Sequence, residues 1–452
     1  MLLEFRAKNY RSFKDEFVFS MIPAAKQKDL SYSVLKKNAG GREYKALCSS
    51  VVYGPNAAGK SNIISAMDTL KKILQRGNVL NPDESSVMRI NPPSVYLDLI
   101  PFISGDENNP TSFFIKFITE DMLIEYSFTV ALGKFASLDY ERDILEESLC
   151  VNGLQVFLRG KSDGANTLAL SFDGFKGKEQ YLNEKVVENF DSLCAISLSS
   201  LNKTELFLTS GFKTIVANKF VEAFLTWINK KFIVIYQADG IQVGKKMPNS
   251  EQDHAYIDGK IDRAAKIFGI SSNSIGFVYP DGERPVLSSL FNRGEEVMTI
   301  PANFFESYGT VRFVNEFPLV ISAILNGGTL VVDEFDASLH PMALMNIINI
   351  FHNDEINKNN AQLIFNTHNP IFLDKNLYRR DEIKFVERDE ETGASSLYSL
   401  SDFKTYGTEG RNNADYMKNY FLDRYGAIKD IDFSQAFIEW MNQAEEKRAQ
   451  NG

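Results

Sequence analysis

One short segment constrains the fold more than any other part of this chain. It runs from residue 54 to residue 61 and consists of Gly54, Pro55, Asn56, Ala57, Ala58, Gly59, Lys60 and Ser61. The apolar run at 47–53 is typical of a buried strand, and residues 62–70, which begin with Asn62, carry apolar side chains at helical spacing. Strand, glycine-rich loop and helix in this order are the context of a phosphate-binding P-loop, so a chance match is the weaker interpretation.

The chemistry of the loop follows from its residue types. Glycines let the backbone curve round an anion, and the N–H groups and the dipole of the following helix face the negative charge. The ammonium group of Lys60 reaches the β- and γ-phosphates, and the Ser61 hydroxyl is an oxygen ligand for Mg²⁺. The sequence therefore predicts binding of a nucleoside triphosphate with Mg²⁺ by residues 54–62.

A second motif supplies the acidic groups that such a site needs. Two glycines at 327–328 end a helical pattern, residues 329–332 are β-prone, and Asp333 and Glu334 follow directly. Ligands gather at the carboxyl ends of parallel strands, where these two acids are expected. Asp333 fits a residue that holds Mg²⁺ through water, and Glu334 fits the base that orients the attacking water. A charged strand end without a role is the alternative, which the P-loop makes the weaker one.

A third apolar run, at 361–365, ends in the polar tip Asn366, Thr367 and His368. His368 at such an end is expected to donate a hydrogen bond to the γ-phosphate. A histidine that only satisfies its own hydrogen bonds is the alternative. The order of P-loop, Asp-Glu strand and His-tipped strand favours the functional interpretation.

Composition narrows the class of protein. The formal net charge of −10 argues against a surface built for nucleic-acid binding, although it leaves a local basic groove open. We find no run of about 18 apolar residues and no signal-peptide pattern, so we expect no membrane span and a cytoplasmic protein. Three widely spaced cysteines suggest neither a disulfide framework nor a zinc site.

The spacing of the motifs predicts insertions within one α/β fold. We expect an N-terminal part of the head at 1–94, a β-rich arm at 95–176, a mainly helical lid at 177–300, and the C-terminal part of the head at 301–452. The lid lacks a sustained heptad repeat, so a compact insertion is expected rather than a coiled coil. Phe304 and Phe305 are expected to pack in a core, and an exposed contact pair is the weaker alternative.

Together these motifs resemble ABC-type ATPase heads of the SMC, RecF and OLD class. Residues 306–312 (ESYGTVR) resemble the signature segment of bacterial defence-island ATPases, residues 335–341 resemble the D-loop, and residues 9–13 (NYRSF) resemble the opening motif of the group. Residues 380–387 and 420–428 resemble the closing motifs of RloA-like, AbiL-type ATPases. The resemblance implies ATP as the nucleotide and an ABC-type P-loop head as the fold.

The resemblance also assigns roles to single residues. Lys60, Glu334 and His368 would be the catalytic residues, while Ser61 and Asp333 would hold the metal. Ser307 and Gly309 would contact the γ-phosphate that a second subunit holds, so ATP would join two heads into a homodimer or a higher homo-oligomer. Arg11 would contact the nucleotide. One departure is the missing Q-loop glutamine after the P-loop, for which Asp98 is a candidate substitute.

Two functions from different classes remain open at this point. In the first, the ATPase senses infection and controls a separate effector, expected to be a Toprim- or RloB-like nuclease because the residues after His368 show no Toprim acid pattern. In the second, a RecF- or SMC-like ATPase clamps DNA during repair or chromosome maintenance, and nucleic acid is then a partner. A scaffold that binds ATP without hydrolysis is a weaker third, because it has no use for Glu334.

Overall fold

The chain was studied as a computed structural model. It describes residues 1–451 apart from 26, 82–96, 104–108, 133–141, 163–164, 175–179, 184–189, 200, 237–253, 258, 270–273, 279–285, 295, 338, 404–414 and 430–431. The expected domain boundaries at 94/95 and 176/177 lie outside these described residues, as does Ser338 of the D-loop-like segment.

A six-stranded sheet forms the centre of the molecule, in the order β11-β16-β17-β5-β18-β19. Its strands are β5 (Ser49–Tyr53), β11 (Phe232–Ile235), β16 (Thr329–Val332), β17 (Gln362–Asn366), β18 (Ile383–Arg388) and β19 (Ser395–Ser399). All neighbours pair in parallel except β18 and β19, which are antiparallel. Since β17 lies between β16 and β5, the three predicted motifs end at one edge of this sheet.

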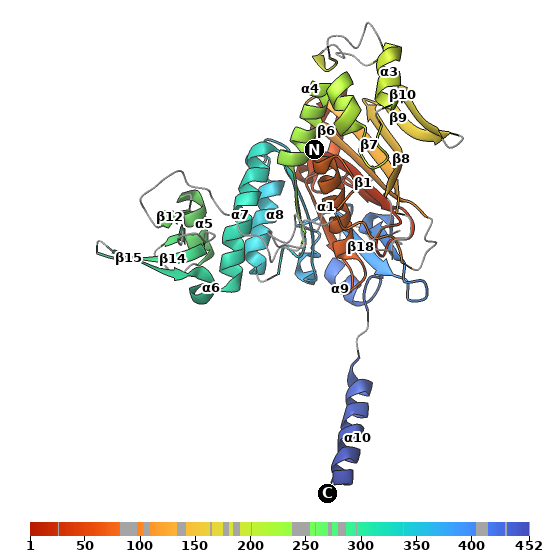
Figure 1. Ribbon diagram of the computed structural model, residues 1–452. Coiled ribbons are helices and arrows are strands. Elements are labelled where there is room, and N and C mark those ends of the chain that lie inside the picture. The colour runs from red at the N-terminus through yellow and green to blue at the C-terminus, as the bar shows by residue number, and fades with distance from the viewer. Residues whose placement is uncertain are drawn as a thin grey trace.

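Helices cover both faces of the central sheet (Figure 1). Helix α1 (Lys60–Arg76) shares one hydrophobic core with Val52 of β5, whereas α7 (Tyr308–Asn326) and α8 (Pro341–His352) share the other with Val51. Successive residues of β5 therefore enter different cores. Burial on both faces explains why the strand is a continuous apolar run rather than an alternating one.

A seven-stranded antiparallel sheet packs beside this centre, in the order β10-β9-β8-β7-β6-β1-β2. It contains β1 (Leu2–Lys8), β2 (Phe17–Ser20), β6 (Thr111–Thr119), β7 (Met122–Ala131), β8 (Asp143–Val151), β9 (Leu154–Ser162) and β10 (Ala165–Leu170). The β-rich arm expected from the sequence corresponds to β6–β10. The N-terminal strands β1 and β2 join the same sheet, because β1 pairs with β6. A separate hairpin is formed by β3 (Val34–Ala39) and β4 (Arg42–Leu47).

The segment expected to be a mainly helical lid is helical only in its first half. That half contains α3 (Phe190–Ser199), the π-helix η4 (Leu208–Val216), α4 (Asn218–Thr226) and the π-helix η5 (Trp227–Lys231). The second half contains α5 (Gly259–Phe268) and a four-stranded sheet of β12 (His254–Tyr256), β13 (Ser274–Val278), β14 (Val286–Arg293) and β15 (Glu296–Pro301). A turn at Gly294, with a φ of 64°, joins β14 to β15, and this local turn chemistry specifies a hairpin.

Short elements complete the chain: α6 (Ala302–Phe305), α9 (Tyr416–Phe421) and α10 (Ser434–Asn451), with 3₁₀ turns η1 (Ser31–Ser33), η7 (Pro370–Phe372) and η8 (Leu400–Asp402). Helix α10 extends away from the rest of the molecule (Figure 1). Among the described residues, we find no helix with the length and apolar character that crossing a membrane requires. The fold is α/β, a P-loop head with a β-rich arm, as the sequence predicts.

Candidate nucleotide-binding site

The P-loop connects the end of β5 to the start of α1, as predicted. Two glycines are required by its geometry. Gly54 has a φ of 154°, and a Cβ there would lie 2.3 Å from the carbonyl oxygen of Val386. Gly59 has a φ of 111°, and a Cβ there would lie 2.6 Å from Ser12 Oγ. Any side chain at either position would push the loop off its neighbours.

Lys60 lies inside the curve of the loop and is buried. Its Nζ donates hydrogen bonds to the carbonyl oxygens of Gly54 (2.9 Å) and Pro55 (3.0 Å). Burial lowers the pKa of Lys60 to about 8, although the nearby acids Glu334 and Asp333 act in the opposite direction. A bound polyphosphate would add negative charge next to the ammonium group and favour its protonated form.

The outside of the loop is held by residues from distant parts of the chain. Ser395 Oγ donates to the carbonyl oxygen of Ala58 (2.6 Å), and Asn62 Nδ2 donates to Ser12 Oγ (2.7 Å). The backbone of Ser395 also donates to the carbonyl oxygen of Ser12 (2.7 Å). These contacts fix the loop before any ligand arrives, which reduces the entropy lost on binding. Ser395 lies in none of the motifs that the sequence shows.

The two acids follow β16 directly, and an asparagine connects them to the P-loop. Asn366, at the end of β17, donates from Nδ2 to Asp333 Oδ1 (2.6 Å) and to Ser61 Oγ (3.4 Å). The backbone N–H of Glu334 donates to Asn366 Oδ1. Asn366 is fully buried, and its contact to Asp333 is buried with it, whereas the contacts to Ser61 and Glu334 are partly buried. One amide therefore sets the positions of both predicted metal ligands and of the predicted base.

Burial raises the pKa of Asp333, and hydrogen bonds from Asn366 and Ser61 partly oppose that rise. Ser61 and Asp333 present a hydroxyl and a carboxylate oxygen, and hard divalent cations such as Mg²⁺ prefer oxygen ligands. A cation at these oxygens would favour the ionised carboxylate, which burial alone disfavours. The donor set therefore fits Mg²⁺.

Glu334 has an unusual backbone and an exposed side chain. Its φ is 51°, in the left-handed region that residues other than glycine seldom adopt. Arg312, a buried residue of α7, donates from Nη2 to the Glu334 carbonyl oxygen (2.7 Å), while its Nε binds Glu316 (2.8 Å). The carbonyl contact from Arg312 and the amide contact from Asn366 together hold this conformation. Strain of this kind commonly occurs at functional sites.

His368 follows β17 at the same edge of the sheet, and its side chain is exposed. Burial of part of the ring, and then the charge of Lys60, lower the pKa of His368. Its neighbour Thr367 donates from Oγ1 to Asp336 (2.6 Å), which ties the strand end to the segment after Glu334. The structure thus brings the predicted P-loop, acids and histidine to one edge.

The predicted signature segment begins α7. Ser307 is exposed and is the N-cap of this helix: its Oγ accepts from the backbone N–H of Thr310 (3.1 Å). Gly309 is buried in the first turn. Phe304, just before the signature, is 82% exposed, and Phe305 is 41% exposed while its ring packs on Phe291. The expectation that Phe304 and Phe305 pack in a core is therefore wrong, because both side chains are exposed, although Phe305 keeps one ring contact.

Arg11 and Asp98 bind each other. Arg11 Nη1 also donates to Asn62 (3.2 Å), and its guanidinium lies 5.7 Å from the Tyr236 ring centre. Asp98 accepts a further hydrogen bond from Ser65 (2.7 Å), in the second turn of α1. Asp98, the candidate substitute for the Q-loop glutamine, therefore binds Arg11 and α1. Asp333, the predicted metal ligand, is contacted by a different residue, Asn366 of β17.

A cavity of about 560 Å³ opens beside the P-loop. It is lined by the outer residues of the loop, by Arg388 and by Lys429, and its rim carries the acids Glu387, Asp389 and Glu390. Arg388 Nη1 lies 3.4 Å from the carbonyl oxygen of Ala57. The cavity gives the loop an open side toward solvent.

Residues 49–374 match the family model described as "AAA domain, putative AbiEii toxin, Type IV TA system". The chain belongs to this family. The matched range contains the P-loop, the two acids, the signature segment and His368. Among curated proteins, none matches the sequence.

Two solved structures of SMC heads are similar to the chain. One is the SMC head domain from Thermotoga maritima, with 13% identity and a TM-score of 0.34 over 88% of this chain and 98% of that chain. The other is the SMC head bound to the C-terminal winged-helix domain of ScpA, with 16% identity and a TM-score of 0.37 over 88% of this chain and 97% of that chain. The assignment of the fold here rests on the strand order and the motif positions described above.

Proposed function

We propose that the chain is a Mg²⁺-dependent ATPase whose two-headed assembly is a molecular switch. The observation that carries this proposal is the hydrogen-bonded group of Ser61, Asp333, Glu334 and Asn366 beside the buried Lys60. In this proposal the group would supply a phosphate-binding ammonium, a set of hard oxygen ligands and a base at one sheet edge. Phosphoryl transfer needs these groups and little else, because its catalysis is mostly positioning and charge neutralisation.

Each residue has a role in this proposal. The P-loop N–H groups and Lys60 bind the phosphates, and Ser61 and Asp333 hold Mg²⁺, which supplies charge neutralisation when bound. Glu334 orients the attacking water and accepts its proton, and His368 donates to the γ-phosphate. Asn366 is a positioning residue, since it acts through Asp333 and Glu334.

The second head supplies the rest of the site. Ser307 lies exposed at the N-terminus of a 19-residue helix, where N–H groups and the helix dipole favour an anion. A γ-phosphate carried by a second copy would dock there, so that two ATP molecules join two heads. Hydrolysis would then release them.

The switch controls a separate effector in a defence system. Support comes from the family description, which names a type IV toxin–antitoxin system, and from the resemblance of residues 380–387 and 420–428 to the closing motifs of RloA-like ATPases. The effector we expect is a Toprim- or RloB-like nuclease. A DNA clamp of the RecF or SMC kind is the alternative that the experiment must separate.

The test is purification of the Glu334→Gln protein with Mg²⁺ and ATP from its native operon, followed by mass measurement. We expect a dimer or a higher even assembly that carries a second polypeptide, with Lys60→Ala as the control that loses both. If the purified protein retains DNA and carries no second polypeptide, its function would be that of a DNA clamp and not the control of an effector. A Glu334→Gln protein that hydrolyses ATP at the wild-type rate would refute the assignment of Glu334 as the base, and a wild-type protein that binds ATP without hydrolysing it would refute the ATPase function.

A further inference from the structure

A second cluster of reactive side chains lies at the opposite end of the central sheet from the P-loop. Cys48 immediately precedes β5, Glu382 immediately precedes β18, and His352 is the last residue of α8. All three are buried, with exposed fractions of 0%, 0% and 5%. Their candidate ligand atoms all lie within 4.8 Å of one another. Segments more than 300 residues apart, at 48 and 352, therefore meet at one point.

The separations between these atoms suit one small cation. His352 Nε2 lies 3.5 Å from Glu382 Oε1, and Cys48 Sγ lies 3.9 Å from the same oxygen. Ligands bound tetrahedrally to zinc, at about 2.0–2.3 Å, are separated from one another by roughly 3.5 Å. Ser49 Oγ lies 2.8 Å from both His352 Nε2 and Glu382 Oε1, at hydrogen-bond distance, so its hydroxyl oxygen would have to draw back from them to serve as the fourth ligand.

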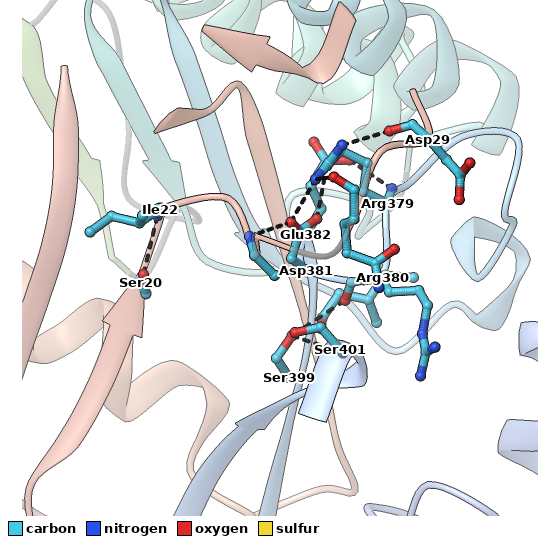
Figure 2. A network of polar contacts seen from close by, with 12 residues as sticks. Ser20, Ile22, Asp29, Arg379, Arg380, Asp381, Glu382, Ser399 and Ser401 are labelled. Carbon is cyan, nitrogen blue, oxygen red and sulfur yellow. Dashed lines mark hydrogen bonds and ion pairs between the residues drawn. The ribbon is translucent and has the colours of Figure 1, made fainter. Parts of the chain in front are cut away.

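The carboxylate is fixed from behind, as carboxylates in metal sites usually are. The backbone N–H of Arg379 donates to Glu382 Oε2 (2.8 Å), which turns Oε1 toward Cys48 and His352. Figure 2 shows this contact and the neighbouring pair in which Arg379 Nη2 and Nε bind both oxygens of Asp381 (2.8 and 2.9 Å). Arg379 also donates to the carbonyl oxygen of Asp29 (2.6 Å), so the loop before β18 is held to the N-terminal segment.

The hydrogen bonds of this cluster leave a buried group beside it unpaired. Ser49 bridges His352 and Glu382, and the Cys48 thiol contacts Glu382 at 3.9 Å and interacts with the Ser33 and Ser49 side chains. The Tyr378 hydroxyl is buried without a hydrogen-bond partner among the described residues, and its ring packs perpendicular to His352, 5.9 Å between centres. A purely structural polar network would be expected to pair such buried groups.

We propose that Cys48, His352 and Glu382 form a structural zinc site. Thiolate, imidazole and carboxylate together suit Zn²⁺ better than a hard cation such as Mg²⁺. On binding, the Cys48 thiol loses its proton to solvent, and thiolate, carboxylate and Zn²⁺ sum to zero charge with a neutral imidazole. A neutral assembly is the form that a fully buried position tolerates. The ion joins the P-loop strand, the helix after the two acids, and β18.

Metal content of the full chain tests this proposal. The protein is produced in zinc-supplemented medium with an affinity tag that binds no metal, dialysed against chelator, and analysed by mass spectrometry for metals. We expect one zinc ion per chain, and X-ray absorption at the zinc edge should show one sulfur at about 2.3 Å with nitrogen or oxygen at about 2.0 Å. Chelation under partially denaturing conditions should lower Tm.

Variants separate this site from other metal sites. Cys48→Ser should lower the zinc content more than about tenfold, whereas Cys150→Ser, on β8, should leave it unchanged. Asp333→Asn, at the nucleotide site, should also retain zinc. Absence of zinc from the wild-type protein, or zinc without a sulfur ligand, would overturn the proposal even if Cys48→Ser fails to fold. Zinc retained by Cys48→Ser at the wild-type level would overturn it as well.

Discussion

Asn366 offers the sharpest test of how the catalytic edge is built. Replacing it by Leu keeps most of the buried volume but removes its contacts to Asp333, Ser61 and the Glu334 N–H. The contact to the Asp333 carboxylate is short and charge-assisted, worth about 1.5–3 kcal/mol, and the other two are worth about 0.5–1.5 kcal/mol each. We therefore expect a loss of about 3 kcal/mol in unfolding free energy, and a fall in Tm of roughly 3 °C.

The effect on hydrolysis should exceed the effect on binding. Glu334 keeps its Arg312 contact but loses the amide contact that helps to hold its left-handed backbone, so we expect kcat to fall about 100-fold, or about 2.7 kcal/mol. The phosphate-binding loop at 54–59 is untouched, so affinity for a fluorescent ATP analogue should change less than about threefold. Phosphate release and analogue binding are measured on the same preparation.

A matched control lies three residues further on. Asn369→Leu removes the cap of η7, where Asn369 Oδ1 accepts from the N–H of Ile371 (3.1 Å), and should lower stability by about 1 kcal/mol without changing kcat. If Asn366→Leu lowers Tm but hydrolyses ATP at the wild-type rate, Asn366 is structural only. The role given to it here would then be refuted.

Three further predictions follow from the same geometry. Burial lowers the pKa of Lys60 to about 8, whereas bound phosphate favours its charged form, so ATP binding above this pH requires the uptake of a proton. ATP affinity should therefore fall by up to about tenfold per pH unit above pH ~8, where ATP itself no longer titrates. Calorimetry in buffers of different ionisation enthalpy should detect the proton uptake, and a constant affinity to pH ~9.5 would contradict it. Arg312→Met should lower the free energy of unfolding by about 3–5 kcal/mol, because it leaves the buried carboxylate of Glu316 without its ion-pair partner. The double variant Arg312→Met/Glu316→Met should recover part of this stability in thermal melts but should not recover kcat in phosphate-release assays. Ser307→Arg should preserve ATP binding by the single chain and prevent dimerisation in light scattering, and loss of binding by the monomer would remove Ser307 from its role in trans.

The motifs could be read from the sequence because each is local. A glycine-rich loop after an apolar run, or two acids after four β-prone residues, can be recognised from about ten consecutive residues. Asn366 was missed because its importance depends on β17 lying between β16 and β5, and its contact to Ser61 joins residues 305 positions apart. Arg312 was noticed only as part of the signature segment. Its contact with the Glu334 carbonyl depends on how α7 packs over the sheet.

The four-stranded sheet in the second half of the insertion was missed for another reason. The helical periodicity at 220–228 is clear, and the structure confirms it as α4 and the start of η5. The rest of the expected lid at 177–300 has a weaker periodicity, so the prediction of a mainly helical lid depends on this one segment. The strand pattern of 286–301 includes the adjacent serines Ser288 and Ser289, both buried in the structure, which break a simple alternation of apolar and polar residues. Phe304 was assigned to a core because its chemistry suggests burial, yet apolar side chains are common on protein surfaces.

The position of Arg312 connects the two halves of the proposed mechanism. Ser307 caps the N-terminus of α7, and Arg312, little more than one turn later on this helix, contacts the carbonyl of Glu334. The element expected to receive a γ-phosphate from the second head is therefore the element that holds the base of the first head. Because a helix moves as a rigid unit at this scale, a shift of its N-terminus toward a phosphate would also shift the Glu334 backbone. In the proposed dimer, each base would thus respond to the nucleotide bound by the other head, and hydrolysis would depend on closure rather than on ATP binding alone.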